Sequence, residues 1–153
     1  MSDVVDLFAS MVRRKEIPQG RLIGCIDGEI ESVERHFNGT LPSAYRDFLT
    51  IAGKGAGKLF QGTDIFYPKV LELQSAANDL LMELDVAGLL PQDAKVFCMH
   101  QGYEINYFLP DLDDPPVFQF FEGQKSVSQP WNSFSEFLRY EVERHLTQWP
   151  DLA

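Results

Sequence analysis

Basic side chains and cysteines are both scarce in this chain. Of its 153 residues, 13 are Lys or Arg and 23 are Asp or Glu, which gives a formal net charge of −10. Binding to a nucleic-acid backbone depends on Lys and Arg, and anionic membrane surfaces attract basic segments. We therefore expect neither partner. The two cysteines, Cys25 and Cys98, are too few for a disulfide framework and favour a reducing compartment.

Long apolar runs are also missing. No stretch of 18 apolar residues occurs, so no membrane-spanning segment is predicted. The N-terminus is acidic and lacks the basic region of a secretory signal, and the expected location is the cytoplasm. The length and the 44% of hydrophobic residues fit one globular domain over residues 1–153, which needs no metal or disulfide to fold.

The negative charge is concentrated in the second part of the chain. Residues 1–60 carry eight basic and eight acidic side chains, whereas residues 61–153 carry five and fifteen. No Lys or Arg occurs between Lys95 and Lys125. A region of one charge sign attracts partners of the opposite sign, although acidity also simply keeps a protein dispersed. We expect an acidic interaction surface here, with the following candidate partner-binding residues: Glu104, Asp111, Asp113, Asp114, Glu122 and Trp131.

Hydrophobic periodicity predicts helices first, then strands, then a last helix. Helical spacing of apolar residues covers 2–15, 28–37, 42–52, 71–87 and the segment after Ser133. Apolar or alternating runs predict strands at 64–67, 96–99, 105–109, 117–121 and, as an edge strand, 126–129. Ser133 and Glu136 fit a capping box. Short connections between the strands favour antiparallel pairing. The predicted fold is thus α+β, a mainly antiparallel sheet flanked by N-terminal helices and one C-terminal helix.

Several chemical motifs are present only in fragments. The Gly- and Lys-rich stretch 53–58 lacks the Ser or Thr of a phosphate-binding loop and is interpreted as a mobile surface loop. Cys98 and His100 face the same side of a predicted strand, but a zinc site needs a second pair of ligands and a nucleophile–base pair needs a third orienting group. Cys98 is more simply interpreted as a buried thiol. For His145 and Trp131, packing in the core is the alternative to a functional role.

The acidic loop 111–116 begins like a calcium-binding loop, with Asp111, Asp113 and Asp114. It has Pro116 where such a loop needs glycine, and strands rather than helices flank it. A solvated hairpin tip or an interaction surface fits better. We therefore predict no metal, no cofactor and no catalytic residue.

The stretch from Ile30 to Gly53 resembles the SUKH superfamily, which includes fungal cell-wall synthesis regulators and bacterial immunity proteins. The matching positions are Glu34, Leu41, Pro42, Tyr45, Arg46, Phe48, Leu49 and Gly53. The later strands and the Ser133–Leu138 segment are similar as well, so that the resemblance covers about residues 22–147. Ala52-Gly53 replaces the asparagine-glycine that often ends this helix. The matching residues themselves are interpreted as structural.

The resemblance implies an α+β fold without catalytic activity. It further implies an immunity-type protein that blocks a cognate bacterial toxin, of the nuclease or deaminase class, by direct binding. Such toxins act on nucleic acids and carry cationic clefts, to which an acidic surface is complementary. Two alternatives stay open: a general interaction scaffold or cell-envelope regulator without a toxin partner, and an enzyme that uses Cys98 and His100.

Overall fold

The computed structural model describes residues 2–153 and shows an α+β fold with an antiparallel sheet. Three helices come first: α1 (Asp3–Arg13), α2 (Asp27–His36) and α3 (Ser43–Ala52). The main sheet has the strand order β3 (Thr63–Asp64), β4 (Lys95–His100), β5 (Glu104–Phe108), β6 (Val117–Phe121) and β7 (Ser128–Trp131). Helix α4 (Leu73–Glu83) connects β3 with β4, and α5 (Phe134–Leu146) follows β7. The predicted fold class is confirmed.

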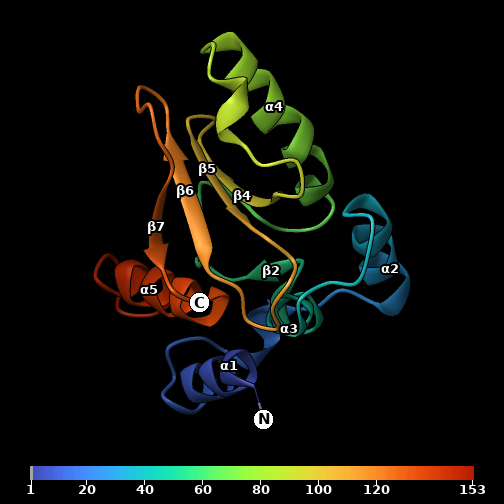
Figure 1. The fold of residues 1–153 in the computed structure, drawn as a ribbon. Helices are drawn as coiled ribbons and strands as arrows, with labels where there is room; N and C mark the ends of the chain where they lie inside the picture. Colours follow the sequence, from blue (N-terminus) through green and yellow to red (C-terminus); the bar gives the residue numbers. More distant parts are fainter. Residues whose placement is uncertain (1) are drawn as a thin grey trace.

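The helices lie on different sides of the sheet (Figure 1). Helices α3 and α5 pack against one face, and α1 lies beyond them, against α3 and α5. Helix α4 runs along β4, where the short β3 leaves part of the strand edge open. There the Gln74 side-chain oxygen accepts a hydrogen bond from the Val96 backbone N–H at 3.0 Å. An otherwise free edge donor is thereby satisfied.

Side chains cap the helices close to the predicted positions. The Ser2 hydroxyl accepts a hydrogen bond from the Val5 backbone N–H at the start of α1. At α5, Ser133 Oγ accepts from Glu136 N at 3.1 Å, which confirms that half of the capping box. The other half differs by one residue, because the Glu136 carboxylate accepts from Asn132 N at 3.0 Å and not from Ser133 N. Both bonds fix where α5 leaves the sheet.

Aromatic side chains form the centre of the core. They come from α3, β4, β5, α5 and the turn at residues 57–62, and the fully buried members are Tyr45, Phe48, Phe60, Phe97, Phe108, Phe134 and Phe137. The Tyr45 ring meets the Phe134 ring edge-on at 5.5 Å, and Phe97 meets Phe137 in the same way at 5.2 Å. Edge-to-face pairs stabilise a core beyond the area that they bury. The cluster therefore joins the N-terminal helices to the sheet and to α5.

The Gly- and Lys-rich stretch is not the mobile loop that the sequence predicts. It contains β2 (Gly55–Ala56), which pairs antiparallel with β1 (Leu22–Ile23). Gly57 has φ +59°, and a Cβ there would lie 1.9 Å from the Leu152 carbonyl oxygen. Only glycine tolerates both the conformation and the contact. The prediction failed because a two-residue strand has no periodicity to detect.

The remaining elements match the predictions apart from their ends, except that β3 shares only Asp64 with the predicted strand 64–67. Helix α4 is shorter than the predicted 71–87, because single-turn helices at Lys69–Glu72 and Ala87–Leu89 flank it, and one more such turn spans Gln19–Arg21. The edge strand β7 lies two residues later than predicted and contains Pro130, which an edge position tolerates. None of the helices within residues 2–153 has the length and apolar character that crossing a bilayer requires.

Candidate functional site

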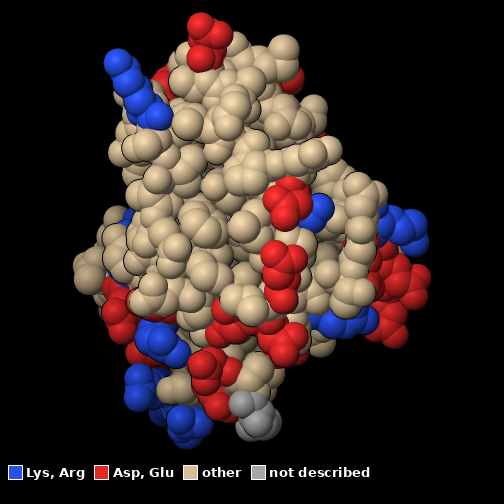
Figure 2. All heavy atoms as spheres, in the orientation of Figure 1, with Lys and Arg blue, Asp and Glu red and all other residues tan. Residues whose placement is uncertain are grey.

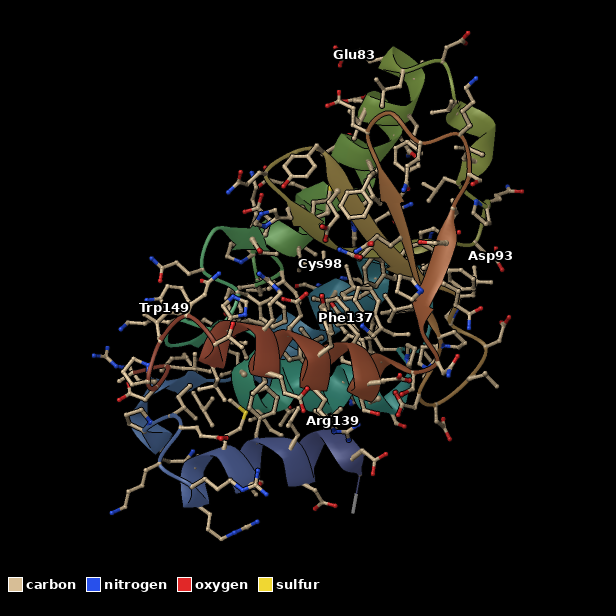
Figure 3. All side chains as sticks on the ribbon, turned by 90° about the vertical axis from the view of Figure 1, so that its left-hand side faces the viewer. Glu83, Asp93, Cys98, Phe137, Arg139 and Trp149 are labelled. Carbon is tan, nitrogen blue, oxygen red and sulfur yellow. The ribbon has the colours of Figure 1, made fainter. Side chains whose placement is uncertain are left out.

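A large cleft lies between the sheet and α5. It has a volume of about 640 Å³, and its lining comes from β4, β5, β6, β7 and α5. Figure 3 looks at this side of the molecule, with α5 passing below the strands, Cys98 above the helix and Arg139 on the lower side of it, toward α1. The N-terminal part of α5 packs on the sheet through Phe134 and Phe137. The cleft opens farther along, where polar side chains face each other.

Three hydrogen-bonded side chains in a row form the polar floor of this cleft: Glu104 and Gln119 line it, and Asn106 lies buried between them. Asn106 lies opposite Gln119 in the pairing of β5 with β6, and Glu104 is two residues away on the same face of β5. Gln119 Nε2 donates to Asn106 Oδ1 at 3.1 Å, and Asn106 Nδ2 donates to Glu104 Oε2 at 2.8 Å. Asn106 is fully buried and Gln119 is 9% exposed. The amides are thus held by each other and by one carboxylate.

Helix α5 supplies the opposite wall of the cleft. Glu141, which is 8% exposed, accepts hydrogen bonds from Arg144 at 2.6 and 3.2 Å through one carboxylate oxygen. Burial alone would lower the pKa of Arg144, but the hydrogen bond and the charge of Glu141 outweigh it and raise that pKa. Arg144 therefore stays charged. The Glu141–Arg144 ion pair, whose two charges cancel, lies near the carboxylate of Glu104.

Cys98 and His100 both line the cleft, which agrees with the prediction that they face the same side of one strand. Cys98 is 1% exposed, and burial raises the pKa of its thiol, with further contributions from Glu141 and Glu104. A thiolate nucleophile is therefore disfavoured. His100 Nδ1 is hydrogen-bonded to Thr63 Oγ1 at 2.8 Å, and its ring meets Tyr103 edge-on. Neither group is set up as the nucleophile or the base of a catalytic pair.

Metal-ligating side chains do not converge. Within residues 2–153, no three His, Cys, Asp or Glu side chains lie close enough to hold one ion. His145 is buried and has two structural partners, since its Nδ1 donates to the Glu141 carbonyl at 2.7 Å and its Nε2 accepts from Phe60 N at 3.2 Å. The neutral ring fits both bonds. The packing role weighed for His145 is thus the one observed.

The predicted acidic residues of the β5–β6 loop have different surroundings. Asp111 and Asp113 are exposed, whereas both carboxylate oxygens of Asp114 accept hydrogen bonds from Ser135, from its N–H at 2.9 Å and its hydroxyl at 2.6 Å. Asp114 therefore acts as a cap at the start of α5. The Asp113 backbone carbonyl accepts from Ala44 N at 2.9 Å, at the start of α3. Two helix N-termini thus fix this loop.

The five predicted carboxylates form two groups. Glu104 and Glu122 lie at one end of the β5–β6 pair, where Glu122 N donates to the Tyr103 carbonyl. Asp111, Asp113 and Asp114 lie at the other end, and Figure 2 shows acidic side chains along the face on which this loop runs. A single patch from all five is therefore not what the fold presents. Strand length separates the two groups.

Trp131 is packed under α5 rather than free on the surface. It is 7% exposed, and its ring lies 4.9 Å from the ring of Phe137 and 5.4 Å from that of Tyr140. One edge of the residue still borders the cleft. Trp131 therefore has the packing role that the sequence analysis gave as the alternative, and it does not protrude as an aromatic anchor.

The residues of the Ile30–Gly53 stretch have structural roles. Tyr45, Phe48 and Leu49 are fully buried, and Arg46 of α3 forms an ion pair with Glu34 of α2 at 3.0 Å. A Cβ at Gly53 would lie 2.6 Å from both Cys25 Sγ and the Leu49 carbonyl oxygen, so this position accepts only glycine. The stretch fixes how α2 and α3 pack.

A comparison with protein families supports the resemblance that the Ile30–Gly53 stretch carries. The model of the SMI1 / KNR4 family (SUKH-1) matches residues 24–140, well over half of the chain. The chain belongs to the SMI1 / KNR4 (SUKH-1) family. A comparison with curated proteins gives no match. The resemblance inferred from the sequence is therefore confirmed at the level of the superfamily.

Sequence reasoning missed the polar floor of this SUKH domain. Asn106 and Gln119 each stand between apolar residues in a buried strand, Ile105 and Tyr107 in the case of Asn106. A lone amide in such a position is the detectable signal, because a buried amide needs partners. Glu141 and Arg144, three residues apart on α5, carry a similar signal. Neither pattern says that the two elements face one cleft.

Proposed function

We propose that this SUKH-family chain is an immunity-type binding protein. It neutralises a cognate bacterial toxin of the nuclease or deaminase class, in the cytoplasm, by direct protein–protein binding through its acidic surface. The proposal needs no cofactor and no catalytic group of this chain. Its partner is a protein with a cationic active-site cleft, which the bound acidic surface would cover.

One observation supports this proposal above the others: two carboxylates are held outward on a fixed loop. The β5–β6 loop is tied to α3 through the Asp113 carbonyl and to α5 through the Asp114 side chain. The side chains of Asp111 and Asp113 are left exposed. A preorganised loop loses little conformational freedom on binding, and its charges attract a cationic partner over a distance.

The experiment begins with the protein encoded beside this gene. The two proteins are co-expressed and purified together, and cell survival is measured with and without the immunity candidate. We expect a stable complex and protection from the toxin. If the neighbouring product is toxic and neither a complex nor protection is found, the proposal is wrong. A complex with a non-toxic neighbour would favour the scaffold or cell-envelope alternative.

Charge reversal then tests the loop. Changing Asp111→Lys and Asp113→Lys together should slow association at low salt about tenfold and flatten its dependence on ionic strength. The control is Asp6→Lys combined with Glu31→Lys, which reverses two exposed charges, on α1 and α2, in the part of the chain where charges balance. Stopped-flow association rates across a salt series measure both. Equal slowing by the control would assign the effect to net charge rather than to this loop.

A further inference from the structure

The amides on the cleft floor have only one consistent orientation. An ionised carboxylate can only accept hydrogen bonds, so Glu104 requires the Asn106 amide to turn its NH₂ group toward it. Asn106 Oδ1 then faces Gln119, which must turn its own NH₂ group to meet it. This leaves Gln119 Oε1 at the end of the row. The charge at one end thus determines which atom the other end offers.

The row therefore presents acceptors to the cleft. Gln119 is more than nine-tenths buried and borders the cleft, and among residues 2–153 no hydrogen-bond donor meets its Oε1 atom. Glu104 likewise uses only Oε2 for Asn106. This oxygen is open to the cleft, where a ligand that brings N–H donors can bond to it. The floor is complementary to a group with several N–H donors and a positive charge.

The walls of the cleft agree with such a ligand. Acidic side chains outnumber basic ones in the lining, which contains Glu104, Glu136, Glu141 and Glu143 against Arg139 and Arg144. Arg144 is paired with Glu141, and Figure 3 shows Arg139 on the lower side of α5. The partly exposed rings of Tyr103 and Tyr140 also border the cleft. Aromatic faces attract cations and cover the apolar stem of a long basic side chain.

We propose that this cleft is the recognition site for an arginine side chain of the partner protein. The guanidinium group donates to Glu104 and to Gln119 Oε1, while its stem lies between the tyrosine rings. A guanidinium fits better than an ammonium, because its planar set of five N–H donors serves two separated acceptors at once. This inference rests on the proposed function and names a subsite for the same partner, separate from the β5–β6 loop.

The test uses N-acetyl-arginine methylamide as the probe with the isolated full-length protein. Side-chain amide signals of Asn106 and Gln119 are followed by ¹⁵N NMR during titration. We expect both signals to shift and to saturate at millimolar probe. The citrulline analogue, which has the same shape without the charge, should leave them unchanged, and the lysine analogue should bind more weakly. Equal binding of the lysine analogue would overturn the guanidinium assignment.

Glu104→Gln is the matched variant. It keeps an oxygen for Asn106 Nδ2, and so the direction of the row, but it removes the charge. We expect about tenfold weaker probe binding, the usual size of one charge-assisted hydrogen bond. Asp113→Asn, which removes a charge outside the cleft, should bind the probe like the wild type. No shift with the arginine probe, or a shift that Glu104→Gln leaves intact, would overturn the site.

If the Glu104→Gln variant does not fold, which a loss of signal dispersion in its NMR spectrum would show, Gln119→Met is tested as a second variant. It removes the free acceptor, and it should also weaken probe binding. The source of the guanidinium is tested with the toxin complex, from which excess probe should displace the partner. A probe that binds but does not compete would overturn the assignment to the partner. Toxin binding without probe binding would overturn only the cleft, whereas absence of toxin binding concerns the proposed function alone.

Discussion

The two parts of this chain treat charge in opposite ways. In residues 1–60, charges balance, and ion pairs join neighbouring elements: Glu34 with Arg46 at 3.0 Å and Glu29 with Lys54 at 3.1 Å. In residues 61–153, fifteen carboxylates meet five basic side chains. Most acidic groups there have no counter-charge in their own half. Ion pairs also occur in residues 61–153, the sheet half, such as Glu141 with Arg144, but the excess of carboxylates leaves most of them there without a basic partner.

This contrast predicts that the two halves respond differently to substitution. The largest effect is expected in the shared core. Phe48→Ala should lower the free energy of unfolding by about 3–5 kcal/mol, since it leaves a cavity among packed rings. Asp111→Asn, on the exposed loop, should stay within about 0.5 kcal/mol of the wild type. Urea denaturation followed by circular dichroism measures both. A Phe48→Ala loss below about 1 kcal/mol would contradict the packed core.

A smaller effect separates two adjacent aspartates of the sheet half. Asp114→Ala should lower the free energy of unfolding by about 1–2 kcal/mol, because it removes the acceptors for the Ser135 N–H and hydroxyl at the start of α5. Asp113→Ala removes an equal charge but no helix cap, and it should change stability little. The same urea measurement applies. Equal losses from both variants would show that the Asp114 cap does not determine stability here.

The smallest effect concerns pH and lies in residues 1–60, the helical half. In the described part of the chain, the His36 Nε2 atom is buried without a hydrogen-bond partner, and burial, with a smaller contribution from Lys95, lowers the pKa of His36. In the pH range below 6.5, the unfolded chain binds a proton at this residue more readily than the folded chain does. Stability should therefore be fully present above pH 6.5 and fall as the pH drops through the lowered pKa.

His36→Gln should remove this part of the pH dependence. The measurement is the midpoint of urea unfolding at a series of pH values between 5 and 8, for the wild type and the variant side by side. We expect the wild-type curve to decline toward pH 5 more steeply than the variant curve. Parallel curves would show that His36 does not titrate differently in the folded and unfolded states.

The sequence predicts the secondary-structure elements of this fold better than the tertiary contacts between them. Apolar periodicity locates the five helices, and the Ser133–Glu136 signature locates the start of α5 to within one residue. Nothing in the sequence distinguishes Asp113 from Asp114, because their roles depend on Ala44 and Ser135, which are distant along the chain. Tertiary contact alone determines which carboxylate remains free. The same holds for the cleft, whose floor and wall come from β5, β6 and α5.

Tyr45 gives the core a particular sensitivity to alkali. Its ring, which belongs to α3, is fully buried against the sheet and α5, and its hydroxyl has no hydrogen-bond partner within residues 2–153. Burial raises the pKa of this phenol far above its usual value near 10, so the folded protein keeps the proton in base while the unfolded chain releases it. The free energy of unfolding therefore decreases as the pH rises above that value. Because Tyr45 packs between elements of both halves, strong base should lower the stability of the whole fold through this one residue.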